Sequence, residues 1–148
     1  MAVLKALCIS SQRQQPKTEV EQAIFVHGGI EGDSHKDFTE REISLLRAED
    51  IQKAALEAGF DFPPGALAEN LIIEGLPQEL PIGGFLAIGD SVELEILEKG
   101  KKADEPHSYD YRGYCLLPLV GYFLRVSREG RVKKGDEVSL VDPGRPDS

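Results

Sequence analysis

Residues 85–97, with the sequence FLAIGDSVELEIL, decide the fold class of this chain. Phe85–Ile88 and Ser91–Leu97 are two short segments rich in apolar residues, and Gly89-Asp90 between them is a dipeptide typical of a tight turn. In the second segment apolar and polar residues alternate, so one side of the expected strand faces water and the other faces a core. The stretch therefore predicts a β-hairpin.

Short apolar segments of the same kind recur on both sides of this hairpin. Residues 48–58 instead have apolar side chains at helical spacing, and Gly59 is a typical helix end. One helix among about eight short strands with regular turns predicts a mainly β protein with one or two helices, folded as a closed or nearly closed β-barrel. The further strands are expected at 2–10, 20–27, 42–46, 70–74, 121–127 and 137–141.

The chain has 148 residues, a length that suits one compact domain. A single domain is expected over residues 1–142, followed by a frayed tail at 143–148. No internal repeat or linker interrupts this range.

Charge and cysteine content narrow the expected partners and location. Seventeen basic and twenty-six acidic side chains give a formal net charge of −9, which repels nucleic acid and anionic membranes. No apolar stretch predicts a signal peptide or a membrane span. Cys8 and Cys115 lie far apart, so no disulfide framework is expected and a cytoplasmic location is predicted.

The stretch at 28–35, GGIEGDSH, combines three glycines, two carboxylates and an imidazole. Glycines let a ligand approach the backbone, and Asp33 and His35 add an acceptor and a titratable nitrogen. This composition suits a loop that binds an anion, a metal or a polar small molecule. The alternative is an ordinary glycine-rich turn in which Asp33 caps its own backbone and His35 is solvated.

A series of short motifs resembles the MOSC domain, the module found at the carboxyl end of molybdenum-cofactor sulfurases and as small free-standing bacterial proteins. The resemblance covers nearly the whole chain, and its specificity lies in the order and spacing of motifs that are weak singly. The motifs are GDSH at 32–35, EISLL at 42–46, PGALAENL at 64–71, GL at 75–76, LPIG at 80–83, IGD at 88–90, GYFLRV at 121–126 and GRVKKGD at 130–136.

The resemblance implies a barrel similar to that of the pyruvate kinase barrel domain, and sulfur or molybdenum chemistry on a cysteine. In related domains a cysteine is proposed to carry sulfur as a persulfide or to ligate the molybdenum of a bound pterin. Many relatives have a Pro-Cys pair where this chain has Pro106-His107. A second cysteine setting of small relatives is matched by residues 113–118, GYCLLP, which makes Cys115 the candidate reactive thiol.

A sulfur carrier needs a thiolate, which requires partial exposure and a positive neighbour. Arg112, Arg41 and a protonated His107 are the candidates for that neighbour. The alternative is that Cys115, flanked by apolar residues, is buried and inert. His107 could itself replace the missing thiolate as a metal ligand beside Cys115, or be a solvated histidine in a charged loop.

The cofactor that the resemblance implies is an anionic molybdopterin-type molecule. It would be bound by Asp33, His35, Arg41 and Asn70, which are expected to form the cleft, together with His107 and Arg112. Asn70 would donate its amide to a phosphate or pterin oxygen; alternatively it locks a neighbouring loop backbone. No pyridoxal phosphate is expected, because the chain lacks the context of a Schiff-base lysine.

Two functions of different classes follow. The first is a carrier or transfer protein of molybdenum-cofactor and sulfur metabolism, with a sulfur donor or a molybdoenzyme as protein partner. The second is a non-catalytic module that binds a pterin, a phosphate ester or a protein after losing the thiol chemistry. A minimal molybdenum oxidoreductase is a third hypothesis, and the missing Pro-Cys pair argues against it.

Overall fold

The computed structural model describes residues 2–11, 17–34, 36–37, 41–100 and 111–141. Its strands are β1 (Ala2–Ile9), β2 (Thr18–Glu19), β3 (Gln22–Val26), β4 (Gly29–Ile30), β5 (Ile43–Arg47), β6 (Leu71–Glu74), β7 (Phe85–Ile88), β8 (Val92–Lys99), β9 (Tyr122–Arg128), β10 (Gly130–Lys133) and β11 (Glu137–Val141), and its helices are α1 (Ala48–Ala58) and α2 (Leu117–Val120).

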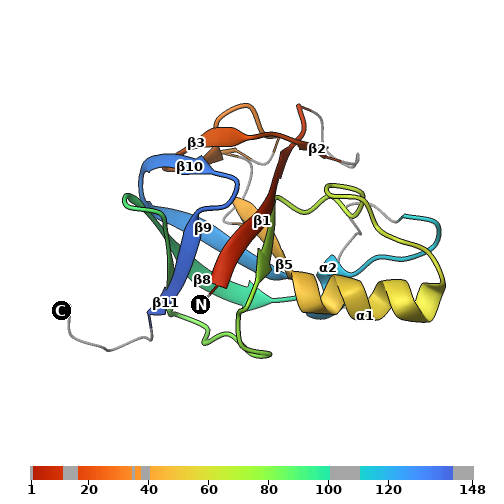
Figure 1. Ribbon diagram of the computed structural model, residues 1–148. Helices are drawn as coiled ribbons and strands as arrows, with labels where there is room; N and C mark the ends of the chain where they lie inside the picture. The colour runs from red at the N-terminus through yellow and green to blue at the C-terminus, as the bar shows by residue number, and fades with distance from the viewer. Residues whose placement is uncertain (1, 12–16, 35, 38–40, 101–110, 142–148) are drawn as a thin grey trace.

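Seven strands close into a barrel in the order β11-β7-β8-β9-β5-β6-β1, and pairing of β1 with β11 completes the ring. All pairs in the ring are antiparallel except β5 with β6, which are parallel. A parallel pair needs a crossover connection, and α1 lies in that crossover, outside the barrel (Figure 1). The prediction of a closed, mainly β barrel is confirmed.

The hairpin expected at 85–97 forms as β7 and β8. Ile88 pairs with Val92 across the turn, and Gly89 adopts a positive φ of 61° there. Val92, Leu94 and Ile96 are fully or nearly fully buried, whereas the glutamates between them are partly exposed, as the alternation predicts. The other strands of the ring supply similar side chains, among them Leu4, Leu45, Leu71, Leu86 and Leu124.

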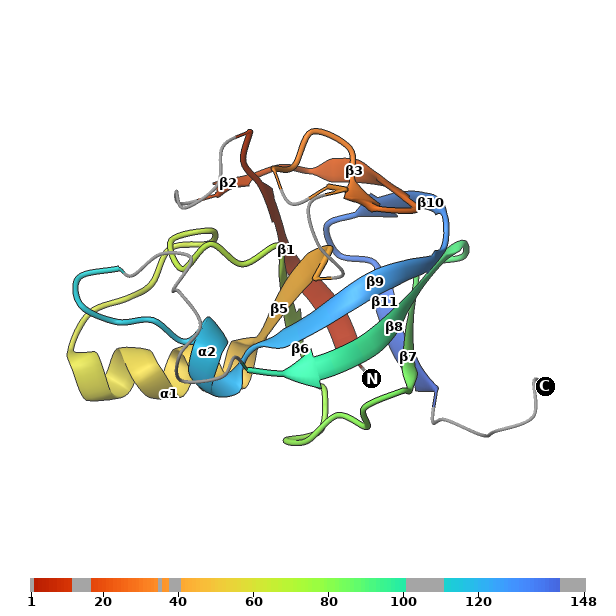
Figure 2. The ribbon, with the colours of Figure 1, turned by 180° about the vertical axis from the view of Figure 1, so that it is seen from behind.

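A second apolar layer lies between the barrel and the two helices. We call it the outer cluster. Ala54, Ile51 and Ala55 of α1 contribute to it, and Figure 2 shows the helix extending from the barrel beside β5 and β6. Its buried members are Leu46, Ala54, Phe62, Leu67, Leu116, Leu117 and Phe123, and the partly buried side chains around them are Ile51, Ala55, Ala58, Phe60, Tyr111, Tyr114 and Val120.

Three short strands were not expected. β2 lies between the strands expected at 2–10 and 20–27, β4 lies inside the glycine-rich stretch at 28–35, and β10 lies between the strands expected at 121–127 and 137–141. β10, β3 and β4 form a separate three-stranded sheet at one end of the barrel (Figure 1). β2 and β4 have only two residues each and therefore no periodicity to detect, and all three strands form through pairing with other strands.

The expected tail at 143–148 lies outside the described residues. No helix in the described part of the chain is long and apolar enough to cross a membrane.

Candidate functional site

Asp33 is held in a buried ion pair. Its Oδ1 accepts a hydrogen bond from Lys17 Nζ at 2.6 Å and another from the backbone N–H of Ser10 at 3.1 Å. The side chains of Lys17 and Asp33 are 1% and 0% exposed. Because both charges are removed from water, each would destabilise the fold strongly if the other were absent. The Asp33 carboxylate, which the sequence predicts to bind a ligand, thus neutralises Lys17. Its hydrogen bond with Ser10 also connects the end of β1 to the glycine-rich loop.

Lys17 is in turn fixed by the loop that begins at Pro64. Its backbone N–H donates to the carbonyl oxygen of Gly65 at 2.8 Å. Gly65 has a φ of 86°, and a Cβ placed there would lie 1.9 Å from the carbonyl oxygen of Lys17. Only glycine fits at this approach of two backbones. This is the physical reason for glycine in the PGALAENL stretch.

The buried side chain of Glu69 stabilises the same loop by hydrogen bonds to its backbone. Its carboxylate accepts hydrogen bonds from the backbone N–H of Gly65 at 2.8 Å and of Leu67 at 3.1 Å. Burial raises the pKa of this carboxyl to about 7, although backbone N–H donors and the positive charge of Lys17 favour its ionised form. Ala68, at a φ of 66°, completes the turn. Loop 65–69 is therefore organised around one buried acid.

Asn70 joins three strands of the barrel. Its Oδ1 accepts from the backbone N–H of Ser44 at 3.0 Å, and its Nδ2 donates to the carbonyl oxygen of Cys8 at 3.0 Å. Its own N–H donates to Ser44 Oγ at 3.0 Å. The side chain thus locks the backbones of β1 and β5 at the start of β6, which is the structural role that the sequence offered as an alternative. We call Lys17, Asp33, Ser44, Glu69 and Asn70 the buried polar network.

Arg41 lies at a different place, just before β5. Its Nε donates to Glu98 Oε1 on β8, and its guanidinium lies over the ring of Phe123, with Cζ 5.3 Å from the ring centroid. A carboxylate at one edge and an aromatic face below fix the orientation of the guanidinium. Arg41 is thereby attached to the outer cluster, to which Phe123 belongs.

Arg112 contacts the outer cluster through a different aromatic ring, that of Phe60. Tyr111 and Tyr114 exchange backbone hydrogen bonds of 2.7 and 2.9 Å, so Arg112 and Gly113 form a two-residue turn, with φ values of 51° and 88°. Two positive φ values define a type I′ turn, in which a non-glycine residue such as arginine costs about 1 kcal/mol. The guanidinium lies over the ring of Phe60, with Cζ 4.0 Å from its centroid.

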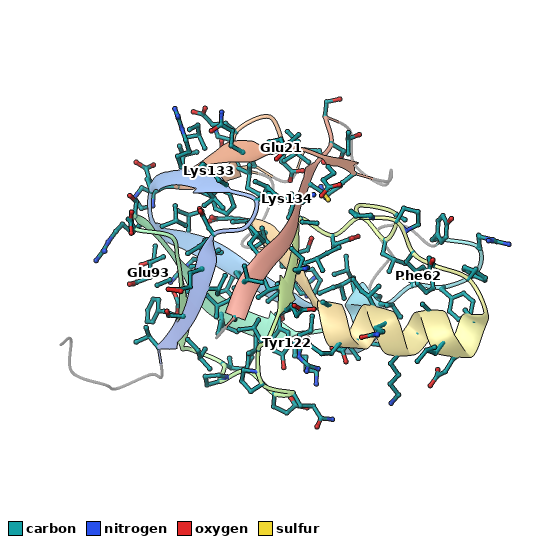
Figure 3. All side chains as sticks on the ribbon, in the orientation of Figure 1. Glu21, Phe62, Glu93, Tyr122, Lys133 and Lys134 are labelled. Carbon is teal, nitrogen blue, oxygen red and sulfur yellow. The ribbon has the colours of Figure 1, made fainter. Side chains whose placement is uncertain are left out.

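The two tyrosines dock this turn onto the segment that follows α1. The rings of Phe60 and Phe62 lie 5.3 Å apart, and the ring of Tyr114 is 5.6 Å from each of them. Tyr111 makes edge contacts with the same two rings. Figure 3 shows Phe62 beside α1, and Figures 1 and 2 both show the segment from residue 111 running next to the loop after that helix.

Cys115 follows this turn directly and precedes Leu116 and Leu117 of the outer cluster. It is half-buried, whereas Cys8 is fully buried in β1. Burial, together with the negative charges of Glu69 and Glu19, raises the pKa of the Cys8 thiol well above its ordinary range. Cys8 is therefore an inert core side chain, and Cys115 is the thiol that a reagent can reach.

The structure thus divides the expected site residues into two groups. Asp33 and Asn70 lie in the buried polar network, and Arg41, Arg112 and Cys115 lie around the outer cluster. Loop 65–69 connects the groups, because Gly65 contacts Lys17 whereas Leu67 belongs to the outer cluster. His35 and His107 lie outside the described residues. In the described part of the chain, no three His, Cys, Asp or Glu side chains are grouped to hold a metal ion.

Sequence reasoning did not single out Lys17, Ser44, Phe60, Glu98 or Phe123. Lys17 stands in a polar stretch with no signal of burial, and the aromatic partners of the two arginines are distant along the chain. The only signal of a turn at Arg112 is the single Gly113 that follows it.

Comparison with solved structures shows that this fold is shared. The YuaD protein from Bacillus subtilis matches with a TM-score of 0.74 and 20% identity, covering 96% of this chain and 97% of that one. YiiM from Geobacillus stearothermophilus matches with a TM-score of 0.68 and 17% identity, over 96% and 76%. YiiM from Escherichia coli has a TM-score of 0.64 and 18% identity, over 95% and 70%. No protein-family model and no curated protein matches the chain.

Proposed function

We propose that this protein is a MOSC-type sulfur carrier or transfer protein of molybdenum-cofactor metabolism, in which the Cys115 thiol holds the sulfur. The observation that carries the proposal is the contrast between the two cysteines: Cys8 is fully buried in the core, whereas Cys115 is only partly buried and directly follows the turn that holds Arg112. The ordered motifs and the fold shared with YuaD and YiiM support it.

The transfer step requires only a thiolate and a persulfide donor. The Cys115 thiolate attacks the outer sulfur of the donor, the sulfur–sulfur bond of the donor breaks, and a new one forms on Cys115. The donor's inner sulfur leaves as a thiolate with the electron pair, so no outside oxidant is needed. Charge balances as well: the outer sulfur keeps its proton, one thiolate reacts and one thiolate leaves.

An anionic molybdopterin-type cofactor fits part of the predicted residue set. Cys115 offers a soft sulfur ligand, and Arg41 and Arg112 offer guanidinium donors for phosphate. When bound, such a cofactor supplies a soft metal centre that takes sulfur. Asp33 and Asn70 have polar atoms engaged by Lys17, Ser44 and Cys8. We therefore assign these two residues to supporting the loop rather than to touching the cofactor.

Pro106-His107, which stands where many relatives in the resembled family have a Pro-Cys pair, favours a second candidate function, a binding module without thiol chemistry. In that case the arginines would still bind an anionic group, while Cys115 would serve only to pack the segment before α2. The two functions differ in the reactivity that they require of one sulfur atom.

Alkylation of Cys115 by iodoacetamide over a pH series distinguishes them. In a Cys8→Ala variant, which leaves a single thiol, the rate for the carrier is expected to reach half its maximum below the pH of about 8.5 that is ordinary for free cysteine. The adduct is located by peptide mass. A half-maximum at or above the ordinary value, or no reaction before unfolding, would contradict the carrier and leave the binding module.

A further inference from the structure

Two arginines around the outer cluster share one arrangement. Each guanidinium lies over the face of a phenylalanine ring, Arg112 over Phe60 at 4.0 Å and Arg41 over Phe123 at 5.3 Å from Cζ to centroid. Phe123 is a buried member of the outer cluster, and Phe60 packs against it. An aromatic ring orients a guanidinium but carries no net charge. A carboxylate, in contrast, compensates the positive charge of the guanidinium.

Turn geometry does not account for an arginine at position 112. A type I′ turn favours asparagine, aspartate or glycine there, and the positive φ of Arg112 is a strained conformation for its side chain. Its contact with Phe60 is made by the guanidinium, so the turn presents a cation at a fixed place. Among the described residues Arg112 makes no ion pair, whereas Arg41 is paired with Glu98.

The segment that follows Arg112 carries Cys115, the thiol of the proposed function. Cys115 is the next residue after Tyr114, whose ring packs on Phe60, and it precedes Leu116 and Leu117, which join Phe123 in the outer cluster. Phe60 therefore contacts the residue before Cys115, and Phe123 belongs to the same cluster as the two residues after it.

We propose that Phe60 and Phe123 are positioning residues that hold the guanidinium groups of Arg112 and Arg41 at the Cys115 segment, so that the thiol meets anionic reaction partners in preference to neutral ones. The proposal rests on the proposed function, because it concerns the partner of a reactive Cys115. It names the substrate class as a small anion bearing the sulfur or the phosphate.

The carboxylates around the two arginines indicate which of the two arginine–phenylalanine contacts contributes more to this preference for anions. Glu98 compensates Arg41 directly, and Asp61 and Glu57 are exposed near Phe60 on the segment after α1 and on the helix itself. In the described structure no carboxylate forms an ion pair with Arg112. The contact of Arg112 with Phe60 is therefore expected to contribute more to the preference of Cys115 for anionic partners than the contact of Arg41 with Phe123.

Paired alkylation rates test this proposal. The probes are iodoacetate, which is an anion, and iodoacetamide, which is neutral and of similar size. In the Cys8→Ala background, the ratio of the two rates at Cys115 is expected to exceed that of a neutral model thiol by about threefold or more. Added salt is expected to lower the ratio, because it screens the guanidinium charges.

Variants separate positioning from general packing. Phe60→Leu keeps an apolar side chain but removes the aromatic face, and it is expected to lower the ratio toward that of the model thiol. Phe60→Tyr is expected to restore it, and Phe123→Leu is expected to have the smaller effect. A ratio that Phe60→Leu and Phe123→Leu leave unchanged would overturn the proposal.

Failure of this proposal is distinguishable from failure of the proposed function. If Cys115 reacts readily with both reagents and the ratio equals that of the model thiol, only the positioning role is wrong. If Cys115 reacts with neither reagent in the folded protein, the sulfur-carrier function itself is wrong.

Discussion

Replacing Asp33 by alanine is expected to lower the free energy of unfolding by about 3 to 5 kcal/mol. The reason is that Lys17, whose side chain is 1% exposed, would remain buried without its carboxylate partner. The backbone N–H of Ser10 would also lose its acceptor. Urea denaturation of the variant and the parent protein measures the difference.

A double variant tests whether the uncompensated charge is the cause. In Lys17→Met/Asp33→Asn the cation is gone, and the asparagine amide oxygen can still accept from Ser10. Most of the lost stability is expected to return, because apolar or neutral replacements of a buried pair are well tolerated. A double variant as unstable as Asp33→Ala, or a loss below about 1 kcal/mol in Asp33→Ala, would contradict the role assigned to the pair.

Glu69 is expected to make the stability of the protein fall as the pH rises from about 4.5 to about 7. The folded state holds the proton more tightly than the unfolded chain does, because burial raises the pKa of this carboxyl. Its contribution is therefore complete below the unfolded pKa and is lost as the pH passes the folded value. Since each pKa unit corresponds to about 1.4 kcal/mol, full titration costs about 3 kcal/mol.

The difference in unfolding free energy between the parent and Glu69→Gln isolates this effect from other titrating groups. Relative to the variant, the parent is expected to lose about 3 kcal/mol of stability across that pH range. Glu74→Gln is the matched control, since it removes an exposed carboxylate from the end of β6. A difference that does not vary with pH, or one that Glu74→Gln reproduces, would show that Glu69 is not the group responsible.

The barrel could be predicted because its signals are local. Alternation in 91–97, the Gly89-Asp90 turn and the helical spacing at 48–58 each depend on neighbouring residues, and α1 has the expected bounds of Ala48–Ala58. The unexpected β2 and β4 are two residues long and depend on partners elsewhere. Local pattern carries no information about such pairings.

The candidate site was predictable only where a motif marked it. Cys115 stood out by its GYCLLP setting, and Asn70 by its place after Pro64-Gly65. That Asp33 pairs with Lys17, and that two arginines lie on phenylalanine rings, follows from chain crossings that a single sequence does not encode locally. Burial then determines which groups a side chain can reach. Asp33, which the sequence suggests as a ligand-binding residue, is paired with Lys17 and Ser10 inside the protein and stabilises a loop there.

The most direct measurement is the mass of the peptide that contains Cys115 after the folded protein has met glutathione persulfide. The carrier is expected to gain one sulfur atom on that peptide, to lose it on treatment with a thiol reductant, and to gain none in Cys115→Ser. Sulfur found on no peptide of the folded protein, or equally in Cys115→Ser, would contradict the account of Cys115 as the residue that holds sulfur.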